Sequence, residues 1–195
     1  MRFLAISGSA RAGSTNTALL RALQDAAPRG IELSVFDGVG RLPVFSPDLD
    51  GPNPPEAVRR FMRMIGESDG LIVSSPEYVR SIPGGLKNAI DWLVSGEAIV
   101  DKPVALAHAS HRGDDMLESL RTVLSTVSGR FTPDIFLRLP LMKMESAEIS
   151  RIVGSPELRR QAQAYLRAFA RFCADDTKPA GGLHAVLRPS VSRSP

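Results

Sequence analysis

The sequence predicts an α/β fold with a five-stranded parallel sheet and helices on both faces. Apolar stretches of strand length alternate with helical patterns along the chain, and strands joined through helices run parallel. Residues 70–74, Gly-Leu-Ile-Val-Ser, are apolar in the way typical of a strand buried on both faces. Unusual loops follow the first, third and fourth predicted strands. Because ligands bind at the carboxyl ends of parallel strands, these loops predict the position of the site.

Each predicted element is identified by its apolar period. Strands are expected at residues 2–6, 31–36, 70–74, 103–107 and 135–139. Helices are expected at residues 17–27, 56–65, 84–94, 116–127 and 156–173, where apolar residues recur at helical spacing. Residues 37–55, rich in proline, predict a long loop. Five strands fit the flavodoxin-like order 2-1-3-4-5 best.

Length and charge predict one domain and a tail. The chain has 195 residues, of which 43% are hydrophobic, a composition that suits a single packed domain over residues 1–176. Residues 177–195, rich in Pro, Gly, Ser and basic residues, predict a flexible tail. The net charge of +3 arises from Lys178, Arg188 and Arg193 in that tail. A body that is neutral by count argues against a nucleic-acid partner.

The predicted compartment is the cytoplasm. No apolar run reaches the roughly 20 residues that a membrane span needs, so no membrane partner is expected. The N-terminus has a strand pattern rather than that of a signal peptide. Cys173 is the single cysteine, so no intramolecular disulfide can form. We expect Cys173 to pack against apolar neighbours in its helix.

The first unusual loop, residues 7–16, reads Ser-Gly-Ser-Ala-Arg-Ala-Gly-Ser-Thr-Asn. A helix N-terminus presents free N–H groups and a partial positive charge, so a loop leading into one suits an anion. The side chains expected to bind a phosphate are Ser9, Arg11, Ser14, Thr15 and Asn16. A capped helix after a tight turn is the simpler alternative. Ser14 stands where a nucleoside triphosphate loop needs lysine, so that chemistry is not expected.

The second unusual loop begins at residue 75 and leads into a helix. Pro76 and Pro83 stiffen it, and Ser81 is placed to cap the helix. An exposed Tyr78 at the end of a strand could cover a flat ligand, although a rigid loop with an incidental tyrosine is the alternative. Within the helix, Lys87 and Asp91 are four residues apart and predict a structural ion pair.

The third unusual loop, residues 108–114, reads His-Ala-Ser-His-Arg-Gly-Asp. Two histidines beside an aspartate invite comparison with a metal site, but such a site needs three or more convergent ligands and no further histidine or cysteine is near. No metal is therefore expected. Ser110 lacks the Gly-x-Ser-x-Gly context of a hydrolase nucleophile.

Two of these loops resemble the NAD(P)H-dependent FMN reductases, flavodoxin-like enzymes that reduce quinones, azo compounds and chromate. The first loop matches the pattern G-S-x-R-x-x-S-x-N, which holds the FMN phosphate in that family. The second matches P-E-Y-N-x-S-x-P-G-x-L-K-N-A-I-D-W, whose Pro-Glu-Tyr segment lies along the isoalloxazine ring. The resemblance covers Met1 to about Cys173. Val79 and Arg80 depart from it, because the family has asparagine and a small residue there.

The resemblance implies FMN as cofactor, NADPH or NADH as co-substrate, a small-molecule electron acceptor, and a homodimer or homotetramer. Besides the phosphate loop, it implies cofactor contacts from Pro76, Glu77, Tyr78, Val79, Ser81 and Ser110. The family's third loop touches the pyrimidine edge of the flavin, and His108, His111 and Arg112 could hydrogen-bond the flavin carbonyls or a substrate. No catalytic residue is expected, since the flavin carries the chemistry.

Two alternatives remain open on the sequence. The first is an FMN-binding electron carrier or sensor without a donor site, which crowding of the ring by Val79 and Arg80 would favour. The second is a scaffold that binds a different phosphate and no FMN. The side chain of Arg80 has two candidate directions, toward the ring or into solvent.

Overall fold

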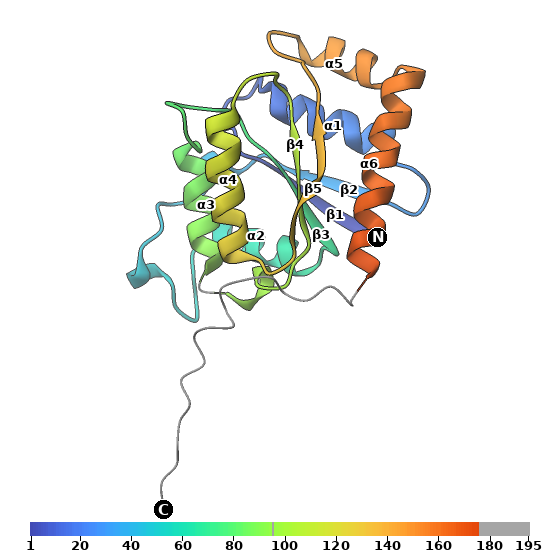
Figure 1. The fold of residues 1–195 in the computed structure, drawn as a ribbon. Helices are drawn as coiled ribbons and strands as arrows, with labels where there is room; N and C mark the ends of the chain where they lie inside the picture. Colours follow the sequence, from blue (N-terminus) through green and yellow to red (C-terminus); the bar gives the residue numbers. More distant parts are fainter. Residues whose placement is uncertain (95, 176–195) are drawn as a thin grey trace, which may run out of the picture.

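The computed structural model describes residues 1–94 and 96–175, and it contains the predicted sheet (Figure 1). Five parallel strands lie in the order β2-β1-β3-β4-β5, which confirms the flavodoxin-like order. The strands are β1 (Arg2–Ser7), β2 (Glu32–Phe36), β3 (Gly70–Ser74), β4 (Val104–His108) and β5 (Phe131–Arg138). The helices are α1 (Thr15–Ala26), α2 (Glu56–Gly66), α3 (Gly84–Val94), α4 (Asp114–Val127), α5 (Ser146–Val153) and α6 (Pro156–Ala174). The predicted tail, residues 177–195, lies outside the described residues.

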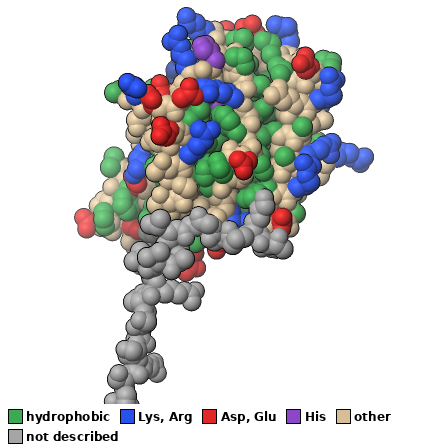
Figure 2. All heavy atoms as spheres, viewed as in Figure 1, with side chains coloured by type: hydrophobic (Ala, Val, Ile, Leu, Met, Phe, Trp, Pro, Cys, Tyr) green, Lys and Arg blue, Asp and Glu red, His purple; other side chains and the backbone are tan. Residues whose placement is uncertain are grey.

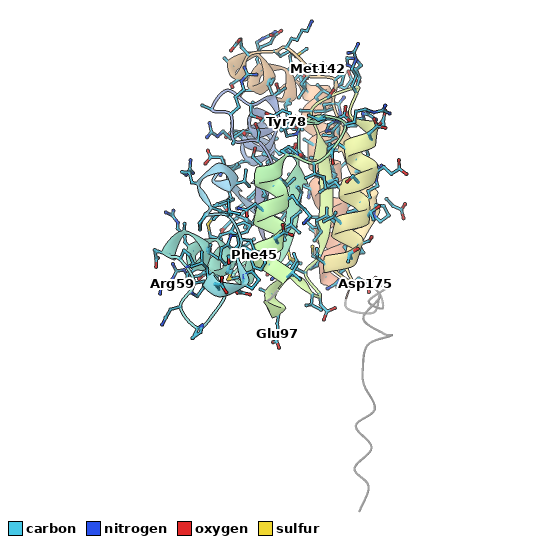
Figure 3. The ribbon with its side chains drawn as sticks, turned by 90° about the vertical axis from the view of Figure 1, so that its left-hand side faces the viewer. Phe45, Arg59, Tyr78, Glu97, Met142 and Asp175 are labelled. Carbon is cyan, nitrogen blue, oxygen red and sulfur yellow. The ribbon has the colours of Figure 1, made fainter. Side chains whose placement is uncertain are left out.

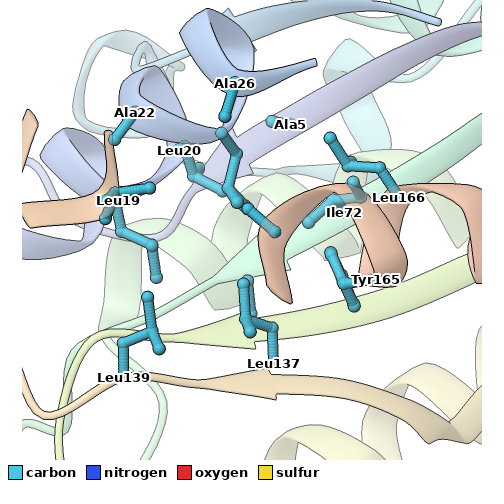
Figure 4. Close-up of a cluster of buried hydrophobic side chains, with 14 of the residues drawn as sticks. Ala5, Leu19, Leu20, Ala22, Ala26, Ile72, Leu137, Leu139, Tyr165 and Leu166 are labelled. Carbon is cyan, nitrogen blue, oxygen red and sulfur yellow. The ribbon is translucent and has the colours of Figure 1, made fainter. Parts of the chain in front are cut away.

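Two apolar clusters cover the two faces of the sheet. Helices α1, α5 and α6 pack on one face, part of which is drawn in Figure 4, and α2, α3 and α4 pack on the other. The buried strand β1 divides its side chains between them: Phe3 and Ala5 join the first cluster, and Leu4 and Ile6 join the second. This alternation follows from the two-residue period of a strand.

Several element boundaries differ from those predicted. Helices α1 and α4 begin two residues early, because Ser14 caps α1 and the acidic Asp114 and Asp115 suit the first turn of α4. Strand β5 begins at Phe131 and contains Pro133, with a shift of register against β4. An edge strand tolerates proline because one side of it makes no ladder bonds. Helix α5 was not predicted at all.

The long segment 37–55 is a loop with two short 3-10 turns, η1 (Val39–Arg41) and η2 (Pro47–Leu49). Helix α3 holds its middle. The Asn88 Nδ2 and Trp92 Nε1 atoms donate to the Pro43 carbonyl at 2.9 and 2.8 Å, and Asn88 Oδ1 accepts from the Phe45 N–H at 2.8 Å. At the other end of the loop, a Cβ atom added to Gly40 would lie 2.7 Å from Ala10 Cβ. The loop therefore connects α3 to the segment that precedes α1.

Two structural expectations about side chains hold. Lys87 and Asp91 form the predicted ion pair on α3. Cys173 is half-buried against the first cluster, and burial raises the pKa of its thiol to about 12, which fits a packing role.

Charges of both signs are intermixed over the face shown in Figure 2. Among the described residues, no helix combines the length and the apolar character needed to cross a membrane.

Candidate cofactor site

A cleft of about 280 Å³ lies where the three unusual loops meet, at the carboxyl ends of β1, β3 and β4. Its wall is formed by Thr15, Asn16, Pro76, Glu77, His108, Ala109, Ser110, Arg112, Gly113 and Met142. In Figure 3, Tyr78 and Met142 mark this end of the molecule, and Glu97 and Asp175 mark the opposite end. The convergence follows from the parallel sheet, in which all strand ends of one kind share an edge.

In the first loop, two serine hydroxyl oxygens accept hydrogen bonds from backbone N–H groups that follow them in the chain. Ser14 Oγ accepts from the Thr17 N–H at 3.4 Å as the N-cap of α1, so the simpler alternative of a capped helix is part of the arrangement. Ser9 Oγ accepts from the Arg11 N–H at 3.2 Å. Ser9 and Ser14 are both buried, whereas Arg11 is exposed at the tip of the loop. A Cβ atom on Gly13 would lie 3.8 Å from Arg11 Nη2.

The first and second loops are joined below the cleft. Ser74 Oγ donates to Asn16 Oδ1 at 2.9 Å, and the Gly8 N–H donates to the Ser74 carbonyl at 2.8 Å. Gly8 has no room for a side chain, because an added Cβ would lie 2.7 Å from Leu86 Cδ2 and 2.9 Å from Ser75 Oγ. Close packing against Ser75 of the second loop and Leu86 of α3 therefore requires glycine at position 8.

The second loop is attached to the first turn of α4. Glu77 Oε2 accepts from the Met116 N–H at 3.1 Å, one of the four N–H groups that a helix leaves unpaired at its start. Arg80 forms an ion pair with Asp115, one residue away on the same turn, and hydrogen bonding to Asp115 raises the pKa of Arg80. Of the two directions considered for Arg80, the structure shows the outward one, with its side chain 83% exposed.

The tip of the second loop is a tight turn in an unfavourable conformation. The backbones of Tyr78 and Ser81 exchange two hydrogen bonds, at 3.1 and 3.0 Å, around Val79 and Arg80. The φ angles of Val79 and Arg80 are 51° and 57°, a region that suits Asn and Gly and strains a β-branched residue. Ser81 closes this turn and does not cap α3, which begins at Gly84 after Pro83. The predicted cap was therefore wrong.

The third loop is folded around a buried histidine. His108 is 1% exposed, and its Nε2 lies 2.6 Å from the carbonyl oxygen of Arg112. Burial lowers the pKa of His108, and the nearby Arg138 charge lowers it further, so the ring is neutral at physiological pH. Gly113 follows with a φ of 99°, and a Cβ there would lie 3.0 Å from His108 Nε2. Within residues 1–94 and 96–175, no group of three His, Cys, Asp or Glu residues could hold a metal ion.

The cleft brings together part of the predicted set. Thr15, Asn16, Pro76, Glu77 and Ser110 line it. The predicted residues that do not line it are Ser9, Arg11, Ser14, Tyr78, Val79 and Ser81. Val79 is 99% exposed. Met142, from the turn between β5 and α5, also lines the cleft. It was not predicted, because a lone methionine in a loop carries no signal of such a role.

A cavity of about 420 Å³ lies elsewhere, between the end of β2 and α2. Although it is larger than the cleft, its wall comes from Val35 to Leu42 and from α2, and none of the three unusual loops contributes to it. The cleft, where helix N-termini and polar loop groups converge, is therefore the candidate cofactor site.

The chain is similar to known quinone reductases and FMN reductases. A quinone reductase from Pseudomonas putida is 32% identical over 169 residues, which cover 83% of this chain and 87% of the relative. An NAD(P)H-dependent FMN reductase from Pseudomonas aeruginosa is 37% identical over 112 residues, or 56% of this chain and 60% of the relative. The solved structure of FerB, a flavoenzyme NAD(P)H:(acceptor) oxidoreductase from Paracoccus denitrificans, matches with a TM-score of 0.69 and 26% identity, covering 89% of this chain and 97% of the other.

The fold is that of a flavodoxin-like protein, and its three unusual loops form a cleft at the carboxyl edge of the sheet. The family model described as NADPH-dependent FMN reductase matches residues 1–139, and the chain belongs to that family. It is therefore an NAD(P)H-dependent oxidoreductase with FMN as its cofactor and NAD(P)H as its co-substrate.

Proposed function

We propose that the cleft holds FMN and that the enzyme oxidises NAD(P)H and reduces a quinone. The observation that carries this proposal is the meeting of the three loops around one cleft, supported by a relative named quinone reductase that aligns over most of both chains. FMN supplies the two-electron chemistry when bound, taking a hydride from NAD(P)H and passing two electrons on to the acceptor.

The donors of the first loop suit a phosphate, which only accepts hydrogen bonds. The hydroxyl groups of Ser9 and Ser14 each accept a backbone N–H, which leaves their own protons to donate. Asn16 accepts from Ser74 through Oδ1, which leaves its NH₂ group to donate. Thr15 and Asn16 line the cleft, and Ser9 and Ser14 belong to the same loop. With the N–H groups of the first turn of α1 and the exposed Arg11, these residues form the proposed phosphate site.

The second and third loops would both contact the flavin ring. The second loop contributes Pro76 and Glu77 to the wall of the cleft, and the third contributes Ala109, Ser110 and Gly113. The Met116 N–H fixes the Glu77 carboxylate, so this wall is positioned before a ligand arrives. A volume of about 280 Å³ is near the lower end of the range for ligand pockets, roughly 300 Å³ and above.

The alternative of an electron carrier without a donor site loses its supporting observation. It depended on crowding of the ring by Val79 and Arg80, and neither side chain lines the cleft.

We also propose a homodimer or homotetramer, as the family resemblance implies. Light scattering on the FMN-loaded protein measures this directly, and a monomer at micromolar concentration would contradict it.

The proposed function is tested by titration and by turnover without oxygen. The protein should bind FMN much more tightly than riboflavin, because riboflavin lacks the phosphate that the first loop is proposed to hold. The loaded enzyme should then oxidise NADPH in the presence of 1,4-benzoquinone, faster than the same concentration of free FMN does. Tight FMN binding without NADPH oxidation would favour the carrier, and equal affinity for riboflavin would contradict the phosphate site.

A further inference from the structure

We propose that Arg112 raises the reduction potential of the bound FMN by stabilising the negative charge that the ring gains with a hydride. The inference rests on the proposed function, since it requires the flavin ring in the cleft.

The charges around the cleft single out Arg112. Of the residues that line it, Glu77, His108 and Arg112 are ionisable. Burial lowers the pKa of His108, which keeps it neutral, and Glu77 is an acid held by the Met116 N–H. Arg112 is therefore the one lining residue, among those that the structure describes, with a full positive charge at neutral pH.

Two neighbouring arginines already have acidic partners. Arg80 pairs with Asp115, and Arg138 Nη1 lies 2.7 Å from Asp114 Oδ1. The Arg112 guanidinium has no ion-pair or hydrogen-bond partner within residues 1–94 and 96–175. No acidic side chain among those residues holds it, which leaves the guanidinium available to a ligand in the cleft.

The backbone of Arg112 is fixed, although its side chain is exposed. Its carbonyl oxygen lies 2.6 Å from His108 Nε2, and its N–H donates to Ser110 Oγ at 2.9 Å. Because a carbonyl only accepts, the neutral His108 carries its proton on Nε2. These two bonds, followed by the left-handed Gly113, hold residue 112 at the wall of the cleft.

The consequence is electrostatic. A hydride brings two electrons and one proton from NAD(P)H, so the ring gains one unit of negative charge. A cation at the cleft wall binds the reduced form more tightly than the oxidised form, and nearby charge is one way in which proteins tune a flavin. Since Arg112 is exposed, salt should weaken the effect.

The test uses the FMN-loaded enzyme and measures potential as well as affinity. The midpoint potential of bound FMN is determined by anaerobic equilibration with a reference dye, for the wild type, Arg112→Gln and Arg112→Lys. Arg112→Gln should reduce the preference for reduced over oxidised FMN about tenfold, which for a two-electron couple lowers the potential by about 30 mV. Arg112→Lys should keep most of the effect, and the difference should shrink in 1 M salt.

Arg41→Gln is the matched control, because Arg41 lies at the other cavity and is paired with Asp37. It should leave the potential unchanged. An Arg112→Gln enzyme that binds FMN with an unchanged potential would overturn the inference, and so would an equal fall in Arg41→Gln. A fall in Arg80→Gln instead of Arg112→Gln would assign the role to Arg80. If the wild type does not bind FMN, the proposed function fails as well, so the two failures are distinguishable.

Discussion

The carboxylate of Glu77 lies 3.1 Å from the backbone nitrogen of Met116, thirty-nine residues later in the chain. This bond joins the loop after β3 to the helix after β4, across the edge of the sheet where the cleft lies. An acid near a helix N-terminus is also stabilised by the helix dipole. Glu77 therefore shapes the cleft and supports the start of α4.

Glu77→Ala should lower the melting temperature of the protein. Loss of an acceptor at a helix start costs about 0.5–2 kcal/mol, and in a domain of this size about 1 kcal/mol shifts the melting temperature by about 2–4 °C. Glu77→Gln, which keeps an acceptor oxygen, should lose less. Glu118→Ala, an exposed site on the same helix, is the control. Thermal unfolding followed by circular dichroism gives the comparison, and equal losses in Glu77→Ala and Glu118→Ala would contradict the role of the bond.

Val79→Asn should stabilise the protein. A residue held in an unfavourable backbone region costs on the order of 1–3 kcal/mol, and asparagine adopts the left-handed region more readily than valine. Because the Val79 side chain is 99% exposed, no packing is lost. Val44→Asn, at an exposed loop valine, should leave the stability unchanged. Urea unfolding measures both variants, and a less stable Val79→Asn would show that the turn is not strained.

Arg11→Ala should weaken FMN binding much more than it alters turnover at saturating FMN. A hydrogen bond to a charged group is worth about 1.5–3 kcal/mol, so the dissociation constant should rise by about ten- to a hundredfold. Quenching of flavin fluorescence measures the affinity. Arg29→Ala, an exposed arginine in the loop after α1, serves as the control. Unchanged affinity with slower turnover would assign Arg11 to the nicotinamide donor instead.

The Cys173 thiol should be nearly unreactive at pH 8 in the folded protein. Burial raises its pKa to about 12, whereas an unfolded cysteine ionises near about 8.5, and the thiolate is the reactive form. A colorimetric thiol reagent should react slowly until urea unfolds the chain. The unfolded state loses this proton first, so Cys173 should make stability fall as the pH rises from about 8.5 to about 12. Cys173→Ala should remove that part of the pH dependence, and fast labelling of the folded protein would contradict the burial.

The sequence predicted local features better than contacts between distant segments. The strand order and the three loops follow from apolar periods and short motifs. The direction of Arg80, in contrast, depends on Asp115, and the purpose of Asn88 depends on Pro43, forty-five residues earlier. Neither partner is adjacent in sequence, so a local pattern gives no information about it.

Two misses have more specific causes. Helix α5 contains Ile149, Ile152 and Val153 at helical spacing, a signal that was present in only eight residues, where helix propensity is weak. Met142 belongs to the cleft because β5 and α5 bring their connecting turn back over the sheet edge. That position is decided by tertiary packing alone.

The hydrogen bonds between α3 and the long loop 37–55 affect which substitutions and insertions should alter cofactor binding. Asn88 and Trp92 fix the loop at Pro43, and Gly40 of the same loop touches Ala10 beside the proposed phosphate site. Substitutions at Asn88 or Trp92, which do not line the cleft, would therefore affect the proposed phosphate site through this loop. Residues 46–54 lie beyond the anchor points, so insertions or deletions there should leave FMN affinity intact, and relatives of this chain are free to differ most in length at that place.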